Sequence, residues 1–113
     1  MNNEAAQQLE DEVRRIARQL WTDATYDGAI LDGGQERDGV FITEDNVHLI
    51  ECTTSRRKEK AIHDVEKLSK HAVTMRQRYP AKAVMCWFIT LEEPTADQRG
   101  VVKNKTNSPN NPA

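Results

Sequence analysis

Several features of secreted and membrane proteins are missing from this sequence. It holds only two cysteines in 113 residues, too few for a disulfide framework, and it has no CxxC or paired Cys/His spacing of the kind that structural zinc sites use. Its longest apolar run, residues 83–89, is far shorter than the roughly 20 residues that span a bilayer. The acidic N-terminus lacks the apolar segment of a signal peptide. We therefore expect a single cytoplasmic domain with no membrane contact.

Charge alone does not decide whether nucleic acid is a partner. The formal net charge is −2 although 30% of the residues are charged, and binding depends on how charges are distributed rather than on their sum. The apolar pattern is more informative. A stripe at helical spacing predicts a helix over residues 4–21; it consists of Leu9, Val13, Ile16 and Leu20. A second stripe predicts a helix over residues 56–79, with Ser55 as its N-cap and Pro80 as its end.

The remaining pattern is that of short strands. They are expected within residues 22–34, where a Gly-rich turn follows, and over residues 37–43, 47–53 and 82–90. The last strand is apolar on both faces, so we expect it in the middle of a sheet that is covered on both sides. The order α-β-β-β-α-β predicts an α/β domain over residues 1–103, with a mixed sheet flanked by helices. Residues 95–104 could start another helix that Gly100 weakens, and the polar residues 104–113 are expected to form a disordered tail.

Two acidic residues stand where strands are expected to end or begin. Asp38 precedes a short apolar run, and Glu51 ends another one across a hairpin-sized span. Adjacent strands would bring the two carboxylates together, where they repel unless a cation lies between them. A hard divalent ion such as Mg²⁺ suits such a pair. The alternative is that both acids are strand-end residues that face solvent.

A cluster of cations stands at the start of the second long helix. Arg56, Arg57, Lys58 and Lys60 lie where the helix dipole disfavours positive charge, but where a phosphate would be bound well. Helical phase places Lys58 close to the apolar stripe, so that it reaches back toward Glu51, and turns Lys60 toward water. The alternative is an ordinary solvated face.

Histidine and tryptophan carry weaker signals. The imidazoles of His48, His63 and His71 have no Ser or Cys partner at a recognisable spacing, so a surface position is expected for all of them. Trp87 and Phe88 alternate faces of the last strand and are expected in the core, with base stacking as the alternative.

At these positions the sequence resembles the PD-(D/E)xK nuclease superfamily, and its Mrr-like members in particular. Glu10 lies on a helix similar to the family's first helix, residues 37–40 (RDGV) resemble its Asp strand, and residues 50–53 (IECT) resemble its (D/E)-x-K strand. The resemblance covers about residues 4–90. The sequence departs from the motif at Thr53, which stands where the family has lysine.

The resemblance implies an αβββαβ restriction-endonuclease-like core and metal-assisted phosphodiester hydrolysis. Asp38 and Glu51, with the Cys52 carbonyl, would hold Mg²⁺ or Mn²⁺. Glu10 would be an auxiliary acid and Lys58 would replace the motif lysine. The cations that would contact the nucleic-acid backbone are Arg56, Arg57 and Lys60.

The resemblance further implies nucleic acid, DNA before RNA, as the partner of an endonuclease that serves as the effector of a prokaryotic defence or restriction system. A homodimer, or membership of a larger defence protein or complex, is expected. One alternative is a nuclease fold that has lost catalysis through Thr53 and binds nucleic acid or a partner protein. Another is an unrelated small α/β interaction domain.

Overall fold

A computed structural model describes residues 4–25 and 39–106. In chain order, its elements are α1 (Glu4–Leu20), β1 (Gly39–Ile42), β2 (Asn46–Thr53), α2 (Lys58–Arg78), β3 (Ala83–Thr90) and α3 (Ala96–Thr106). The predicted α/β class is confirmed, because these residues form a mixed sheet between helices. The short strand expected within residues 22–34 falls mostly outside the described residues, as does Asp38.

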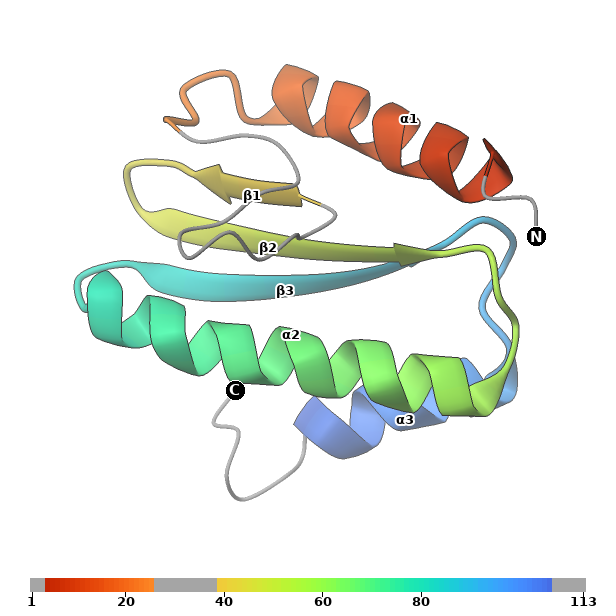
Figure 1. The fold of residues 1–113 in the computed structure, drawn as a ribbon. Helices are drawn as coiled ribbons and strands as arrows, with labels where there is room; N and C mark the ends of the chain where they lie inside the picture. Colours follow the sequence, from red (N-terminus) through yellow and green to blue (C-terminus); the bar gives the residue numbers. More distant parts are fainter. Residues whose placement is uncertain (1–3, 26–38, 107–113) are drawn as a thin grey trace.

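The sheet has the order β1-β2-β3. β1 and β2 form the expected antiparallel hairpin, in which Gly39 is opposite Ile50 and Ile42 is opposite Val47. β3 lies parallel to β2, and α2 makes the crossover that a parallel connection requires. Figure 1 shows α1 on one face of the sheet and α2 with α3 on the other. The face to which a β2 side chain points therefore decides which helix it meets.

Alternation along β2 divides the core into two layers. The layer under α2 consists of Val40, Ile42, Val47, Leu49, Leu68, Ala72 and Met75. The layer under α1 consists of Val13, Ala17, Phe41, Ile50 and Cys52. The same alternation sends Cys52 and Glu51 to opposite faces, since Cys52 packs with the α1 layer while Glu51 bonds to a lysine of α2. Glu51 thus continues the row of Val47 and Leu49.

The expectation for the last strand is wrong within the described residues, since β3 is the edge of their sheet rather than its middle. On the α1 side, Met85 and Trp87 remain 42% and 40% exposed. The physical reason is that α1 packs over β1 and β2, so the odd-numbered side chains of β3 extend beyond the helix that covers their neighbours. An apolar sequence such as that of β3 predicts burial on both faces only when another strand lies on each side of it in the sheet.

The ends of the helices also differ from expectation. α2 begins at Lys58 with Arg57 at the N-cap position, because Ser55 Oγ accepts the Arg57 N–H and forms a turn before the helix. α3 forms despite Gly100 and continues to Thr106, so residues 104–106 are helical rather than part of a tail. A capping box starts it: Gln98 N–H donates to Thr95 Oγ1 and Thr95 N–H to Gln98 Oε1.

Candidate functional site

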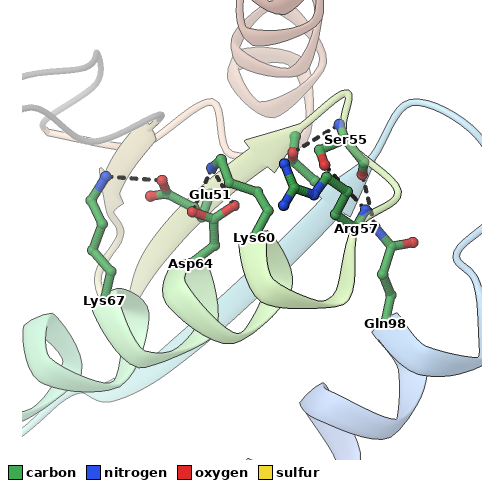
Figure 2. Close-up of polar contacts among 8 residues, drawn as sticks. Glu51, Ser55, Arg57, Lys60, Asp64, Lys67 and Gln98 are labelled. Carbon is green, nitrogen blue, oxygen red and sulfur yellow. Dashed lines mark hydrogen bonds and ion pairs between the residues drawn. The ribbon is translucent and has the colours of Figure 1, made fainter.

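Glu51 is a buried acid near the carboxyl end of β2. Its side chain is 5% exposed, and its Oε1 accepts a hydrogen bond of 2.9 Å from the ammonium of Lys67 on α2, which is itself 34% exposed. Figure 2 shows the lysine extending from the helix to the acid. Because an ionised carboxylate is costly to bury alone, the ammonium is its natural partner.

A second buried acid lies on α2 itself. Asp64 is 1% exposed, and both of its carboxylate oxygens accept from Lys60 Nζ, at 2.6 and 2.7 Å. Lys60, Asp64 and Lys67 follow the i, i+4, i+7 spacing, so they share one side of the helix and project together toward β2 (Figure 2). Two acid–lysine pairs therefore line the space between the end of β2 and the first half of α2.

Thr53, at the motif lysine position, has a structural use. Its side chain is buried, its Oγ1 accepts the Ser55 N–H at 3.0 Å, and its backbone oxygen accepts the Leu91 N–H at 3.2 Å. Gln98 of α3 donates to the Ser55 carbonyl at 2.9 Å. These bonds fix the turn between β2 and α2, and with it the position of α2 relative to Glu51.

The expectation that Lys58 reaches back toward Glu51 is wrong, because the lysine that α2 supplies to Glu51 is Lys67. Lys60 is exposed as expected, and its ammonium also binds Asp64. Lys58 is exposed and lines a groove between α2 and α3. The apolar stripe alone sets a helical phase that leaves out the buried Asp64, which widens the inward face of α2. Sequence could have revealed it, since Asp64 stands one residue before a stripe position and four after Lys60.

Arg56 and Arg57 lie in the loop between β2 and α2, where both side chains are exposed. Arg56 pairs with Glu92 at 3.2 Å and Arg57 with Glu59 at 3.4 Å. Exposed pairs of this kind contribute little to stability. Both guanidinium groups can therefore exchange a carboxylate for another anion at small cost.

The other predicted ligands are placed as follows. Glu10 pairs with Arg14 at 3.7 Å on α1, the helix on the face opposite α2 (Figure 1). The Cys52 side chain is buried on that same α1 side. Asp38 lies outside the described residues, and its neighbour Gly39 is opposite Ile50, the residue before Glu51. Within residues 4–25 and 39–106, no three His, Cys, Asp or Glu side chains gather as a metal-binding group.

The surface position expected for His48 is wrong, because this residue of the central strand is 6% exposed. Its ring stacks on Trp21 with centroids 3.8 Å apart, and its Nδ1 accepts the Trp87 indole N–H at 3.1 Å. Burial lowers the pKa of His48. The cluster lies on the α1 face, across the sheet from Glu51, and is a separate feature of the molecule.

Comparisons with protein-family models, with curated proteins and with solved structures found no match for this chain. The assignment of a function therefore depends on the residues and on their geometry. In the described structure, two buried acids near the end of β2, Glu51 and Asp64, each pair with a lysine of α2. Two exposed arginines lie in the turn between these two elements.

Proposed function

We propose that this chain is a metal-dependent nuclease domain that hydrolyses phosphodiester bonds, with Glu51 as its central acid and Lys67 in the role of the missing motif lysine. The observation that carries the proposal is the 2.9 Å contact between the Lys67 ammonium and the buried Glu51 carboxylate. A motif of the (D/E)-x-K type joins an acid and an ammonium at one strand end. Here the same two groups meet, with the lysine supplied by α2 instead of position 53.

The ion that we propose for this site is a hard divalent one. Mg²⁺ is usually held by only one or two carboxylates, with water and substrate phosphates completing its shell. Glu51 is a carboxylate at the end of a central strand, and Gly39, adjacent to Asp38, is paired with the residue before Glu51. Asp38, Glu51 and the Cys52 carbonyl are the proposed ligands of Mg²⁺ or Mn²⁺. When bound, such an ion activates a water and stabilises charge on the phosphoryl group.

The chain's own residues would supply the rest. The Lys67 ammonium, partly open to water, can donate a hydrogen bond to the attacking water or to a phosphate oxygen while Glu51 holds it in place. Arg56 and Arg57 present exposed guanidinium groups, which bind phosphate oxygens in a bidentate manner. These contacts position the backbone without reading its sequence. DNA as the substrate and a role in prokaryotic defence are proposed from the resemblance alone, and a cytoplasmic location is proposed from the sequence composition.

A catalytically inactive module that binds nucleic acid is the second candidate. It is favoured by Thr53, whose hydroxyl accepts the Ser55 N–H in the turn before α2 and whose carbonyl accepts the Leu91 N–H after β3, so position 53 supplies no ammonium to a substrate. In that case Lys67 would serve only to balance the charge of Glu51, and the arginines would still bind phosphate.

Cleavage of plasmid and single-stranded DNA in Mg²⁺ or Mn²⁺ tests the proposal. Glu51→Gln and Lys67→Met should each lower the rate at least about 100-fold, in line with the loss of a charged group at a reacting centre. Lys70→Met, an exposed lysine of the same helix, is the matched control and should cleave like the wild type. Circular dichroism confirms that each variant is folded.

Measurements of DNA binding and of DNA cleavage together distinguish the active nuclease from the inactive module. DNA binding that Arg56→Ala/Arg57→Ala weakens, without cleavage by the wild type in either metal, would establish the inactive module. Full cleavage by Glu51→Gln would reject the site. Equal cleavage by Lys67→Met and Lys70→Met would remove Lys67 from the reaction.

A further inference from the structure

The free edge of β3 is unusual for an exposed strand. Its eight residues are AVMCWFIT, with neither a charge nor a proline, although edge strands are normally protected from self-association by such residues. Within the described residues, it is hydrogen-bonded on one side only, to β2. Cys86, Met85 and Trp87 are exposed along it. An apolar edge of this length is a template for another strand.

An apolar hollow lies beside that edge on the α1 side. It has a volume of about 250 Å³, and β3 contributes Trp87 and Ile89 to it. From α1 come Ile16 and Leu20, which belong to the predicted apolar stripe yet are 42% and 69% exposed. Half of the stripe of α1 thus faces a space that this chain leaves open in the described structure.

We propose that β3 pairs antiparallel with β3 of a second copy of this chain, about a two-fold axis at Trp87, and so joins the two sheets into one. The backbone sets this register. Ala83 N–H and Leu91 N–H both point to the β2 side, to Asp45 and Thr53 carbonyls. Because the direction of the backbone N–H and C=O groups alternates along a strand, these groups of the even-numbered residues of β3 point to the free edge.

An axis at Trp87 uses all of these outward groups. It places Val84 opposite Thr90 of the second copy, and Cys86 opposite Phe88, as the doubly bonded pairs of an antiparallel ladder. Both copies then keep their α1 faces on the same side, so Met85 and Trp87 of one copy lie along the hollow of the other. An axis at Cys86 would leave Thr90 opposite Lys82 instead.

The charged residues at the two ends of β3 also favour a second copy of this chain as the partner. Lys82 precedes β3, and its ammonium binds the Thr43 and Glu44 carbonyls. Glu92 follows β3 by two residues and forms an exposed pair with Arg56. Antiparallel pairing places Lys82 of one copy beside Glu92 of the other, twice by symmetry, while parallel pairing would place equal charges side by side. The self-complementary pattern, uncharged in the middle and opposite at the ends, points to a second copy rather than to an unrelated chain.

Sedimentation equilibrium and light scattering of the full chain test the interface. The expected mass is twice the 12.9 kDa of one chain. Met85→Lys puts a charge into the hollow of the second copy, and Trp87→Lys sets two like charges against each other at the axis. Each should weaken the dimer about tenfold or more. Val73→Lys, a half-exposed valine on α2, is the control and should leave the dimer intact.

The register has its own test. In a Cys86→Ser background, Trp87→Cys places two thiols in directly opposite positions, at a Cα separation that suits a disulfide, and mild oxidation should cross-link the dimer. Met85→Cys in the same background should not cross-link. A single-chain mass at all concentrations, or equal loss of the dimer in Val73→Lys and Met85→Lys, overturns the interface. Cross-linking through position 85 and not 87 overturns the register.

Discussion

Removal of the Lys67 ammonium is the sharpest test of how the site is held. In Lys67→Met, the helix keeps a side chain of similar length, but the Glu51 carboxylate, 5% exposed, loses the donor at 2.9 Å. Breaking a buried ion pair from one side costs about 3–5 kcal/mol. Because Lys67 is 34% exposed and water can enter at its end, we expect the lower value, about 3 kcal/mol. In a domain of this size that corresponds to a fall in Tm of roughly 10 °C or more.

Removing the charge of Glu51 instead of that of Lys67 should lower the free energy of unfolding by less. Glu51→Gln keeps the shape of the side chain and leaves behind a lysine that can turn its ammonium into solvent, so we expect about 1 kcal/mol. Replacing both partners by apolar groups, in Glu51→Leu/Lys67→Met, should be close to neutral, because no charge stays buried. Lys70→Met, on the exposed side of α2, should stay within about 0.5 kcal/mol of the wild type.

Urea unfolding at neutral pH, followed by circular dichroism at one protein concentration, measures all four free energies. With the single variant Glu51→Leu added, a double-mutant cycle isolates the coupling of the pair. If Lys67→Met unfolds like Lys70→Met, or if Glu51→Gln is the more damaging single change, the difference in burial between the two partners does not govern their energetics, and the reasoning is refuted.

Two further predictions concern stability. Burial lowers the pKa of His48 below its unfolded value of about 6.5, so its contribution is complete above that pH and is lost as pH falls through the folded pKa. The unfolding free energy of the wild type should thus fall more steeply on acidification than that of His48→Asn, and parallel curves would contradict this. Gly39→Ala should destabilise by about 1 kcal/mol, because its Cβ would lie 3.0 Å from the ring of buried Phe41. Gly100→Ala, with open space in α3, should stabilise by about 0.5–1 kcal/mol; a reversed order in chemical denaturation would refute the pair.

The local sequence pattern was sufficient to predict the elements that depend only on neighbouring residues. The stripe of α2, with Ala61, Leu68 and Ala72 buried as expected, and the β1–β2 hairpin follow directly from periodicity and turn length. The opposite faces of Glu51 and Cys52 follow from alternation alone. These features need only the neighbouring residues, and the sequence displays them.

One incorrect expectation has a local cause: Ser55 precedes a helix as an N-cap does, but its Oγ accepts the Arg57 N–H in a turn that delays the helix. The others concern residues whose deciding partner is distant in the sequence. Lys67 bonds to an acid sixteen positions away, a contact that only the crossover creates. The residues of β3 could not predict that it lies at the edge of the sheet. An apolar strand indicates a preference for burial, but it does not indicate which elements lie beside it.

The burial of Glu51 is not what folding alone would favour. On the α2 face of β2, the row Val47, Leu49, Glu51 changes from apolar to charged toward the strand end, where a third apolar residue would bury more surface at no electrostatic cost. Buried ion pairs seldom stabilise more than the apolar residues that could replace them. A Glu51→Leu/Lys67→Met variant that is as stable as the wild type but no longer cleaves DNA would show that the charges serve a ligand. If that variant still cleaves, the pair belongs to the scaffold, and catalysis must be sought elsewhere in the chain.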